Sequence, residues 1–390
     1  MLANKIKHGA AIACASLVLG SPAWAQDQSK PHSFRFYGHI NPTILSVDDG
    51  QVTTTEIVDN ANSGGRLGFW YEHSVNANTF RINGEISLGI RTSAGVSQLY
   101  TPQFIEWKGQ SVRKFEAIWD TEKFGSISLG QGSMGSDGVT ESDLSGTTLA
   151  SSVGISDVAG GFFFRNQAGS LSSVRIKDAY PTFDGGRSQR LRYDSPEINF
   201  SRIGKLKFAA SVGTESIDRN VTLNDALSDA GMFYRNQLGN FVLAGSAGVS
   251  IADVPTGTAP QIAGSFSVLH APTGANITFA SGSRDGGGSY VFSKVGFRGN
   301  WFNSGDTAIS FDVYDSHDTV VSGSHARSYG IGVLQHLSRH NVDMFIGLRK
   351  YEYDGGGAIQ YQDMYSAMIG VRWVFRRLQN RTIFEGLWQE

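Results

Sequence analysis

Hydrophobic and polar residues alternate along much of this chain, and residues 78–91, NTFRINGEISLGIR, show the pattern clearly. Phe80 and Ile82 fall on one parity, whereas Arg81 and Glu85 fall on the other. A period of two predicts a β-strand with an apolar and a charged face. In a soluble sandwich the apolar face would meet a packed core. In a membrane barrel it would meet lipid, and the charged face would line a water-filled lumen.

Sixteen strand-like runs recur from one end of the chain to the other. Each has about the 9–11 residues that a tilted membrane strand needs. No segment has helical periodicity over three turns, and no stretch is typical of a domain linker. The strands are expected at 34–45, 65–73, 78–91, 110–120, 124–131, 189–195, 205–215, 230–237, 241–251, 261–269, 275–284, 289–301, 307–316, 327–338, 342–353 and 363–375.

The links between these runs mostly alternate between short and long. The links 74–77 and 339–341 are short, whereas 46–63 and 92–109 are long and polar. An outer-membrane barrel has tight periplasmic turns at one end and longer outer loops at the other, which a soluble sandwich does not require. Aromatic residues also lie near strand ends, where a membrane barrel carries its aromatic girdles. We therefore expect an all-β protein, a transmembrane antiparallel β-barrel of about sixteen strands.

The N-terminal residues have the features of a secretory signal peptide. Lys5 and Lys7 precede a short apolar run, and AWA at 23–25 fits a small-x-small cleavage site. The apolar run is too short for a spanning helix. We predict a signal peptide over 1–25, a barrel domain over 26–375 and a C-terminal tail over 376–390, with export to the cell outer membrane.

Composition excludes several other classes of protein. The one cysteine, Cys14, lies in the predicted signal peptide, so the mature chain has no disulfide and no thiolate chemistry. The 33 Lys and Arg nearly balance the 35 Asp and Glu, which gives no overall attraction to nucleic acid. We expect no nucleic-acid partner.

Four motifs, in order along the chain, resemble the general porins of Gram-negative outer membranes. They are FRFYGHINPTILSVDDG near the start, FEAIWDTEKFGSISLGQGS before a long segment, QRLRYDSPEI after it, and IGVRWVF near the end. The resemblance implies a sixteen-stranded barrel, commonly trimeric, that passes small hydrophilic solutes. It also implies a loop that folds into the lumen and constricts the pore.

Two features depart from the family pattern. Closing strands usually end the chain on an aromatic residue, but fifteen residues follow Phe375 here. We interpret these fifteen residues as a periplasmic tail. The alternative is that TIFEGLW within them forms a further or alternative final strand. The segment expected to hold the constriction loop, 132–188, is also long, and its GGFFFRN stretch is either an extra strand or a plug.

The sequence contains no convincing catalytic, cofactor or metal motif. Gly130, Gly132 and Gly135 have the G-x-G-x-x-G spacing, but the polar stretch that follows does not predict the helix that a dinucleotide site requires. His336 and His340 lie on a predicted strand and turn, not on one helical face. We expect no enzyme activity, no cofactor and no metal site.

The candidate site is a pair of opposed charge rows across the lumen. The resemblance implies that acids of the inward loop face basic residues of inward parity on nearby strands. Such rows would orient dipolar solutes and set ion preference. The expected pore-lining residues are Arg35, Arg66, Arg81, Lys114, Arg190 and Arg192 on the wall, and Asp137, Glu141 and Asp143 on the loop.

Two functions follow from this interpretation. The first is a porin for passive diffusion of small hydrophilic solutes and ions, surrounded by outer-membrane lipid and expected to form a homotrimer. The alternative is a substrate-specific channel or surface receptor with a saturable binding site. The two differ in whether a single solute blocks the conductance.

Overall fold

The computed structural model describes residues 32–214, 226–254 and 257–376. The predicted signal peptide and residues 377–390 of the predicted tail lie outside the described residues. The strands are β1 (His32–Ile40), β2 (Pro42–Asp48), β3 (Thr53–Asp59), β4 (Arg66–Val75), β5 (Asn78–Ser87), β6 (Val112–Thr121), β7 (Gly125–Ser133), β8 (Phe163–Arg165), β9 (Leu171–Arg175), β10 (Arg187–Asp194), β11 (Ile198–Asn199), β12 (Lys205–Thr214), β13 (Ala226–Leu238), β14 (Phe241–Val254), β15 (Gly257–His270), β16 (Ala275–Arg284), β17 (Ser289–Phe302), β18 (Gly305–His317), β19 (His325–Leu337), β20 (Val342–Asp354) and β21 (Met364–Arg376). The helices are η1 (Ala61–Ser63), η2 (Ser93–Gly95), η3 (Gly109–Ser111), η4 (Ser201–Ile203), α1 (Ser156–Ala159) and α2 (Ile176–Ala179).

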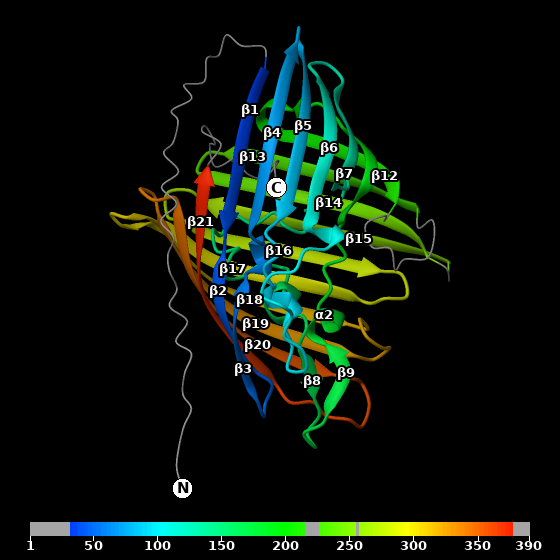
Figure 1. The fold of residues 1–390 in the computed structure, drawn as a ribbon, viewed down its shortest axis with the longest axis vertical. Coiled ribbons are helices and arrows are strands. Elements are labelled where there is room, and N and C mark those ends of the chain that lie inside the picture. The colour runs from blue at the N-terminus through cyan, green and yellow to red at the C-terminus, as the bar shows by residue number, and fades with distance from the viewer. Residues whose placement is uncertain (1–31, 215–225, 255–256, 377–390) are drawn as a thin grey trace.

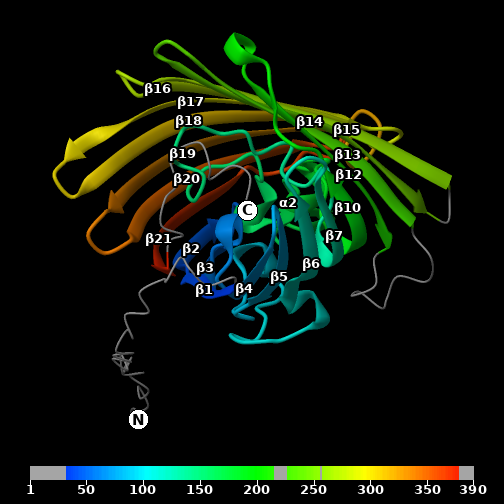
Figure 2. The same cartoon turned by 90° about the horizontal axis from the view of Figure 1, so that it is seen from above.

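The strands other than β8 and β9 form one antiparallel sheet that closes on itself. β1 and β2 follow one another as one wall strand, and β3 and β4 form the next, with η1 between them. The last strand, β21, pairs with both β1 and β2, which joins the two ends of the sheet. Within the described residues this is a closed barrel of sixteen wall strands, as the sequence predicted. Figure 2 shows the wall curving around the segment that carries α2.

The two faces of the wall differ as the alternation predicted. On β6 and β7, Phe115 and Leu129 are 65% and 63% exposed, whereas their sequence neighbours Glu116 and Ser128 are buried inside the barrel. Exposed apolar side chains alternate in this way around the wall and give it the lipid-facing band of a membrane barrel. Exposed aromatic residues near the ends of the strands include Phe34, Phe36, Trp119, Trp301, Trp373 and Phe375.

The long links lie at the outer end of the barrel, but short links occur there as well. The predicted long link 46–63 is instead the hairpin of β2 and β3, with only 49–52 between the strands. Residues 53–59, TTTEIVD, are polar enough to resemble a loop, but they pair with β2 at the outer end of the barrel. The outer link 285–288 is also short, whereas 88–111 and 134–186 are long. Figure 1 shows β1 and β4–β7 in front of the strands β13–β20.

The segment 134–186 does not add a strand to the wall. It carries α1, α2 and a separate two-stranded sheet, in which β8 of the GGFFFRN stretch pairs with β9. Phe162 and Phe164 of that stretch are fully buried. The GGFFFRN stretch therefore does contain an extra strand, β8, which lies outside the wall sheet, and its buried phenylalanines pack in the apolar cluster inside the barrel. No helix in the described part of the chain is long and apolar enough to cross a membrane.

Candidate functional site

The first half of the long loop is fixed to the inner wall by a row of side-chain oxygens. Ser211 and Asp229 accept hydrogen bonds from the Gly135 backbone N–H, at 2.8 and 2.9 Å. Further along, Ser265 Oγ accepts from the N–H of Ser142 and donates to the carbonyl of Val139, at 2.9 and 2.8 Å. The hydrogen bonds that continue the row involve Ser246, Ser267, Ser310 and Asp312. Small hydroxyl residues at inward positions of β12–β18 thus hold the loop backbone against one side of the lumen.

A buried ion pair anchors the same part of the loop. Lys294 Nζ of β17 donates to Asp143 Oδ2 at 2.6 Å and to the carbonyl of Ser151 at 2.5 Å. The side chain of Lys294 is fully buried. Next to it, Asp312 accepts a hydrogen bond from Ser151 and forms a bidentate pair with Arg349, at 2.8 Å for each contact. Because both pairs are removed from water, each loop carboxylate or hydroxyl has little freedom to leave the wall.

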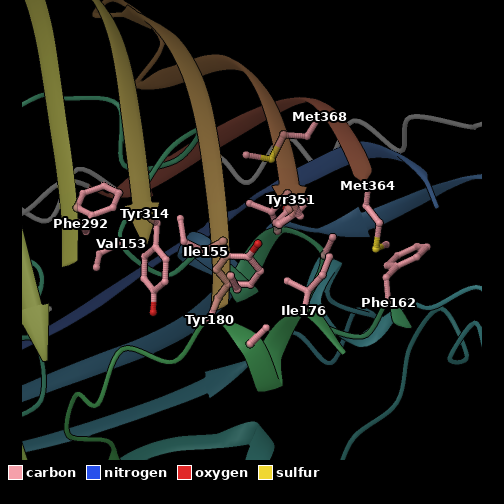
Figure 3. Close-up of a cluster of buried hydrophobic side chains, with 14 of the residues drawn as sticks. Val153, Ile155, Phe162, Ile176, Tyr180, Phe292, Tyr314, Tyr351, Met364 and Met368 are labelled. Carbon is pink, nitrogen blue, oxygen red and sulfur yellow. The ribbon is translucent and has the colours of Figure 1, made fainter. Parts of the chain in front are cut away.

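The second half of the loop packs through an apolar cluster. Tyr180 next to α2 is fully buried, and its hydroxyl donates to backbone carbonyls of Arg327 and Glu352 at 2.8 Å. Burial raises the pKa of Tyr180 well above its ordinary value, so this hydroxyl stays a neutral donor. The cluster joins the loop to β17–β21 (Figure 3) and includes Val153, Ile155, Phe162, Ile176, Tyr180, Phe292, Tyr314, Tyr351, Met364 and Met368.

The ends of the loop meet at the opposite, charged wall. The Met134 N–H donates to the carbonyl of Gly186 at 2.9 Å, so the loop leaves and rejoins the wall between β7 and β10. Arg192 of β10 donates to the carbonyls of Met134 and Ser133 at 2.7 and 3.1 Å. The loop therefore crosses the lumen from a basic wall at its base to the hydroxyl-lined wall where it is anchored.

A group of cations lies on the basic wall around one carboxylate. Glu85 of β5 contacts Arg113 Nε at 2.6 Å and Arg66 Nη1 at 3.9 Å, and Lys114 lies opposite it in the strand register. The Tyr37 hydroxyl donates to the other oxygen of Glu85 at 2.9 Å. Three cationic side chains thus share a single carboxylate, which leaves this part of the wall with a positive excess.

The expected basic residues divide into two groups. Arg35 and Arg81 lie at the periplasmic end, where Arg35 pairs with Glu72 at 2.5 Å and Arg81 pairs with Asp120. Both carboxylates line the small polar pocket at that end. Arg66, Lys114, Arg190 and Arg192 lie on the wall at the base of the loop. The sequence placed all six opposite the loop, and the structure brings only the second group there.

Arg190 and Arg192 are tied into ion pairs of their own. Arg190 is buried against Glu116 and donates to the carbonyls of Ser133 and Gly130, at 2.9 and 3.0 Å. Arg192 forms a bidentate pair with Asp194, at 2.8 Å for each contact. These two arginines therefore stabilise the wall and the base of the loop, and their charges are largely balanced.

The three expected loop acids have different surroundings. Asp137 lies within electrostatic range of Lys114 and Arg192, across the gap between loop and wall. The carboxylate of Glu141 lies over Gly138 on the same turn of the loop. Asp143 instead faces the anchoring wall and is buried against Lys294, so its charge is not presented to the lumen. Ion pairing with Lys294 holds the pKa of Asp143 below its usual range.

Sequence reasoning missed several members of this site. Arg113 has the outward parity of β6, but a register shift between Glu85 and Ile86 turns it toward Glu85. Asp184 lies in the long loop and was not among the expected pore-lining residues. Its carboxylate accepts a hydrogen bond from Thr140 Oγ1 at 2.6 Å. Burial, together with the nearby charge of Asp137, raises the pKa of Asp184 to about 7. The inward parity of Lys294 on β17 could have identified it as a residue of the inner wall. Parity does not show that it pairs with Asp143.

A closed antiparallel barrel with an apolar outer face, a charged inner face and a loop fixed inside it defines a transmembrane β-barrel channel. The chain matches the family described as Gram-negative porin over residues 10–356, and it belongs to that family. The protein is an outer-membrane channel for the passive diffusion of small hydrophilic solutes. The resemblance inferred from the four motifs is therefore confirmed.

Solved structures with similar folds are also porins or outer-membrane proteins. The anion-selective porin from Comamonas acidovorans is 15% identical, with 88% of this chain and 100% of that chain covered and a TM-score of 0.56. OmpF of Salmonella typhi in complex with daunomycin is 13% identical, with coverage of 88% and 98% and a TM-score of 0.54. A loop L8 deletion mutant of OmpT from Vibrio cholerae is 12% identical, with coverage of 89% and 100% and a TM-score of 0.55. A search of curated protein sequences gave no significant match.

Proposed function

We propose that this porin is a non-saturating diffusion channel with a preference for anions. Ions pass through the gap between the anchored loop and the basic wall. The observation that carries the proposal is the group of Arg66, Arg113 and Lys114 around the single carboxylate of Glu85. Across the gap, Asp137 and Glu141 contribute negative charge, and Asp184 contributes little below about pH 7 because its pKa is raised. A positive excess on one wall attracts anions and orients dipolar solutes.

Reversal potentials in a planar bilayer test the preference directly. The purified porin is placed between two KCl solutions of unequal concentration at pH 6, and the zero-current potential is measured. We expect the sign that corresponds to faster passage of chloride than of potassium. The opposite sign would contradict the proposed anion preference.

The same recordings separate this function from that of a substrate-specific channel. Conductance should rise with salt concentration without saturation, and no single sugar, amino acid or dicarboxylate should block it. Block by micromolar to millimolar amounts of one solute would instead indicate a saturable site. Membership of the porin family supports diffusion as the activity, and we infer that the protein catalyses no reaction.

We also propose that the barrels associate as a homotrimer. Support comes from the family resemblance and from a similar structure described as the trimer form of Vibrio cholerae OmpT. Small residues on the outer face could allow close packing between barrels; Gly38 and Gly84 are covered by the rings of Phe375 and Phe69 in the same barrel, whereas Ala210 is exposed. Mass measurement in mild detergent, with an unheated gel as a second assay, should give three chains per particle. A particle of one chain would contradict the trimer.

A further inference from the structure

Two histidines and an aspartate meet on the outer surface of the barrel, away from the lumen. His317 ends β18 and His325 begins β19, and the two are direct partners in the strand register. Asp315 lies two residues before His317, on the same face of β18. That face continues through Phe311 and Ile331, which are exposed apolar residues of the outer wall. The three side chains therefore project outward at the end of the barrel that carries the long links.

The ligand atoms of these side chains already converge. Asp315 Oδ1 lies 2.9 Å from His317 Nε2 and 3.1 Å from His325 Nε2. The two imidazole rings are stacked, with centroids 4.4 Å apart and planes 5° apart, so both Nε2 atoms point the same way. Ligands bound tetrahedrally to zinc at about 2.0–2.2 Å lie about 3.3 Å from each other. Small rotations of the side chains would therefore suffice to hold an ion between them.

The neighbouring Arg327 orients the carboxylate rather than closing the site. Its guanidinium donates to Asp315 Oδ2, with Nε at 2.7 Å and Nη2 at 2.6 Å. Oδ1 faces the two histidines. A second group that fixes a ligating carboxylate in this way is common around protein metal sites. One side of the site stays open, because the side chain of His317 is 59% exposed.

We propose that Asp315, His317 and His325 bind a divalent transition-metal ion of the zinc, copper or nickel class at the outer rim of the barrel. Two imidazole nitrogens and one carboxylate oxygen suit these ions, whereas calcium and magnesium prefer all-oxygen sites. Water completes the coordination on the exposed side. The ion would tie the ends of β18 and β19 together beside the link 318–324. Sequence spacing did not indicate this site, because its ligands come from two paired strands.

Zinc titration of the purified barrel tests the proposal. The titration uses protein prepared without a histidine tag. Calorimetry with zinc alone then measures binding to wild type, His317→Ala, His325→Ala and Asp315→Asn. We expect one ion per chain for wild type and at least a tenfold loss of affinity in each variant. His270→Ala is the matched control, because His270 lies at a turn on the opposite end and contacts Thr273, not a carboxylate. It should bind zinc like wild type.

Copper provides a second readout that does not depend on affinity. Electron paramagnetic resonance of the copper-loaded barrel should show coupling to two imidazole nitrogens in wild type and to one in either histidine variant. Migration of the unheated barrel on a gel confirms that each variant is folded. Equal zinc affinity in wild type and the three variants, or a copper spectrum unchanged by both histidine substitutions, would overturn the proposal.

Discussion

The side chain of Lys294 ends 2.6 Å from the carboxylate of Asp143, inside the barrel and out of contact with water. This pair joins the inner wall to a loop more than a hundred residues away in sequence. Hydroxyl residues and an apolar cluster continue the attachment on either side of it. The position of the loop, and with it the shape of the gap through which solutes pass, depends on this attachment.

Substitution of Asp143→Asn should release this part of the loop. It leaves Lys294 as a buried charge without its anionic partner, a loss that typically costs about 3–5 kcal/mol. We expect noisier single-channel currents, a changed conductance and faster cleavage of the loop by added protease, with the barrel still formed. Glu197→Gln is the control, because its pair with Lys205 is exposed and worth about 0–1 kcal/mol. Identical currents and cleavage in wild type and Asp143→Asn would show that the pair does not anchor the loop.

The lipid-facing side of the wall should reject charge. Leu129 lies in the middle of β7 and is exposed on the outer face. Leu129→Arg should lower the free energy of unfolding by about 2–4 kcal/mol, because the guanidinium meets hydrocarbon. Leu129→Met keeps the volume and the apolar character and should cost less than about 1.5 kcal/mol. Urea unfolding in lipid vesicles measures both, and an Arg variant as stable as the Met variant would place this face away from lipid.

Loss of one wall cation should weaken the anion preference according to its position. Lys114→Gln removes a charge from the group around Glu85 and opposite Asp137, so the reversal potential should move toward that of a cation-selective pore. Arg81→Gln removes a charge of equal size at the periplasmic end, where Asp120 balances it. The Arg81→Gln variant should fold normally and should change the reversal potential less than Lys114→Gln does. A larger effect from Arg81→Gln would locate the selective region at the periplasmic mouth.

The ion preference should also change with pH near neutrality. The pKa of Asp184 is raised to about 7, so this carboxyl is neutral below pH 7 and gains a negative charge above it. Passage of cations should therefore increase as pH rises through 7, and Asp184→Asn should reduce this step. Burial also raises the pKa of Asp157 to about 7, but burial is its one cause, whereas Asp184 is also coupled to Asp137 at the gap, so Asp157→Asn should change the step less than Asp184→Asn does. Reversal potentials between pH 5 and 9 provide the measurement.

The same raised pKa has a consequence for stability. Between about pH 4 and 7 the folded chain keeps a proton on Asp184 that the unfolded chain has lost. Because the folded state then binds more protons, stability falls as pH rises through this window. Asp184→Asn should make that dependence less steep in urea unfolding measured at pH 4.5, 6 and 7.5, while Asp157, whose pKa is also raised to about 7, continues to contribute. An unchanged slope would show that Asp184 does not titrate there.

Removal of residues 376–390 should leave a chain that still inserts. Phe375 then becomes the terminal residue, and its ring still lies over Gly38 of β1. Pairing of His39 and Ile40 with Val374 and Trp373 also remains, so the barrel stays closed. Outer-membrane fractions of cells that express the shortened chain should contain heat-modifiable barrel. Its absence would show that residues beyond Phe375 are required for insertion.

The sequence by itself determined the wall of this protein. Strand alternation has a local cause, because successive side chains point to opposite faces whatever the rest of the chain does. The lipid-facing and lumen-facing residues of β5, β6 and β7 were therefore predictable, as was the closed barrel of sixteen strands. The polar hairpin of β2 and β3 was the main error, because threonine and aspartate at the outer end of a strand do not differ in composition from a loop.

Only the tertiary structure decided which groups meet. Alternation along β12–β18 predicted that their serine hydroxyls point inward. It did not predict that they bind the backbone of a loop from a distant part of the chain. Arg113 faces Glu85 because a register shift interrupts the alternation. Asp143 meets Lys294 because the loop folds into the lumen, and His317 meets His325 because β18 pairs with β19. Periodicity reports the face of each residue, whereas its partner depends on strand order, register and the path of the loop, and these follow from packing of the whole chain.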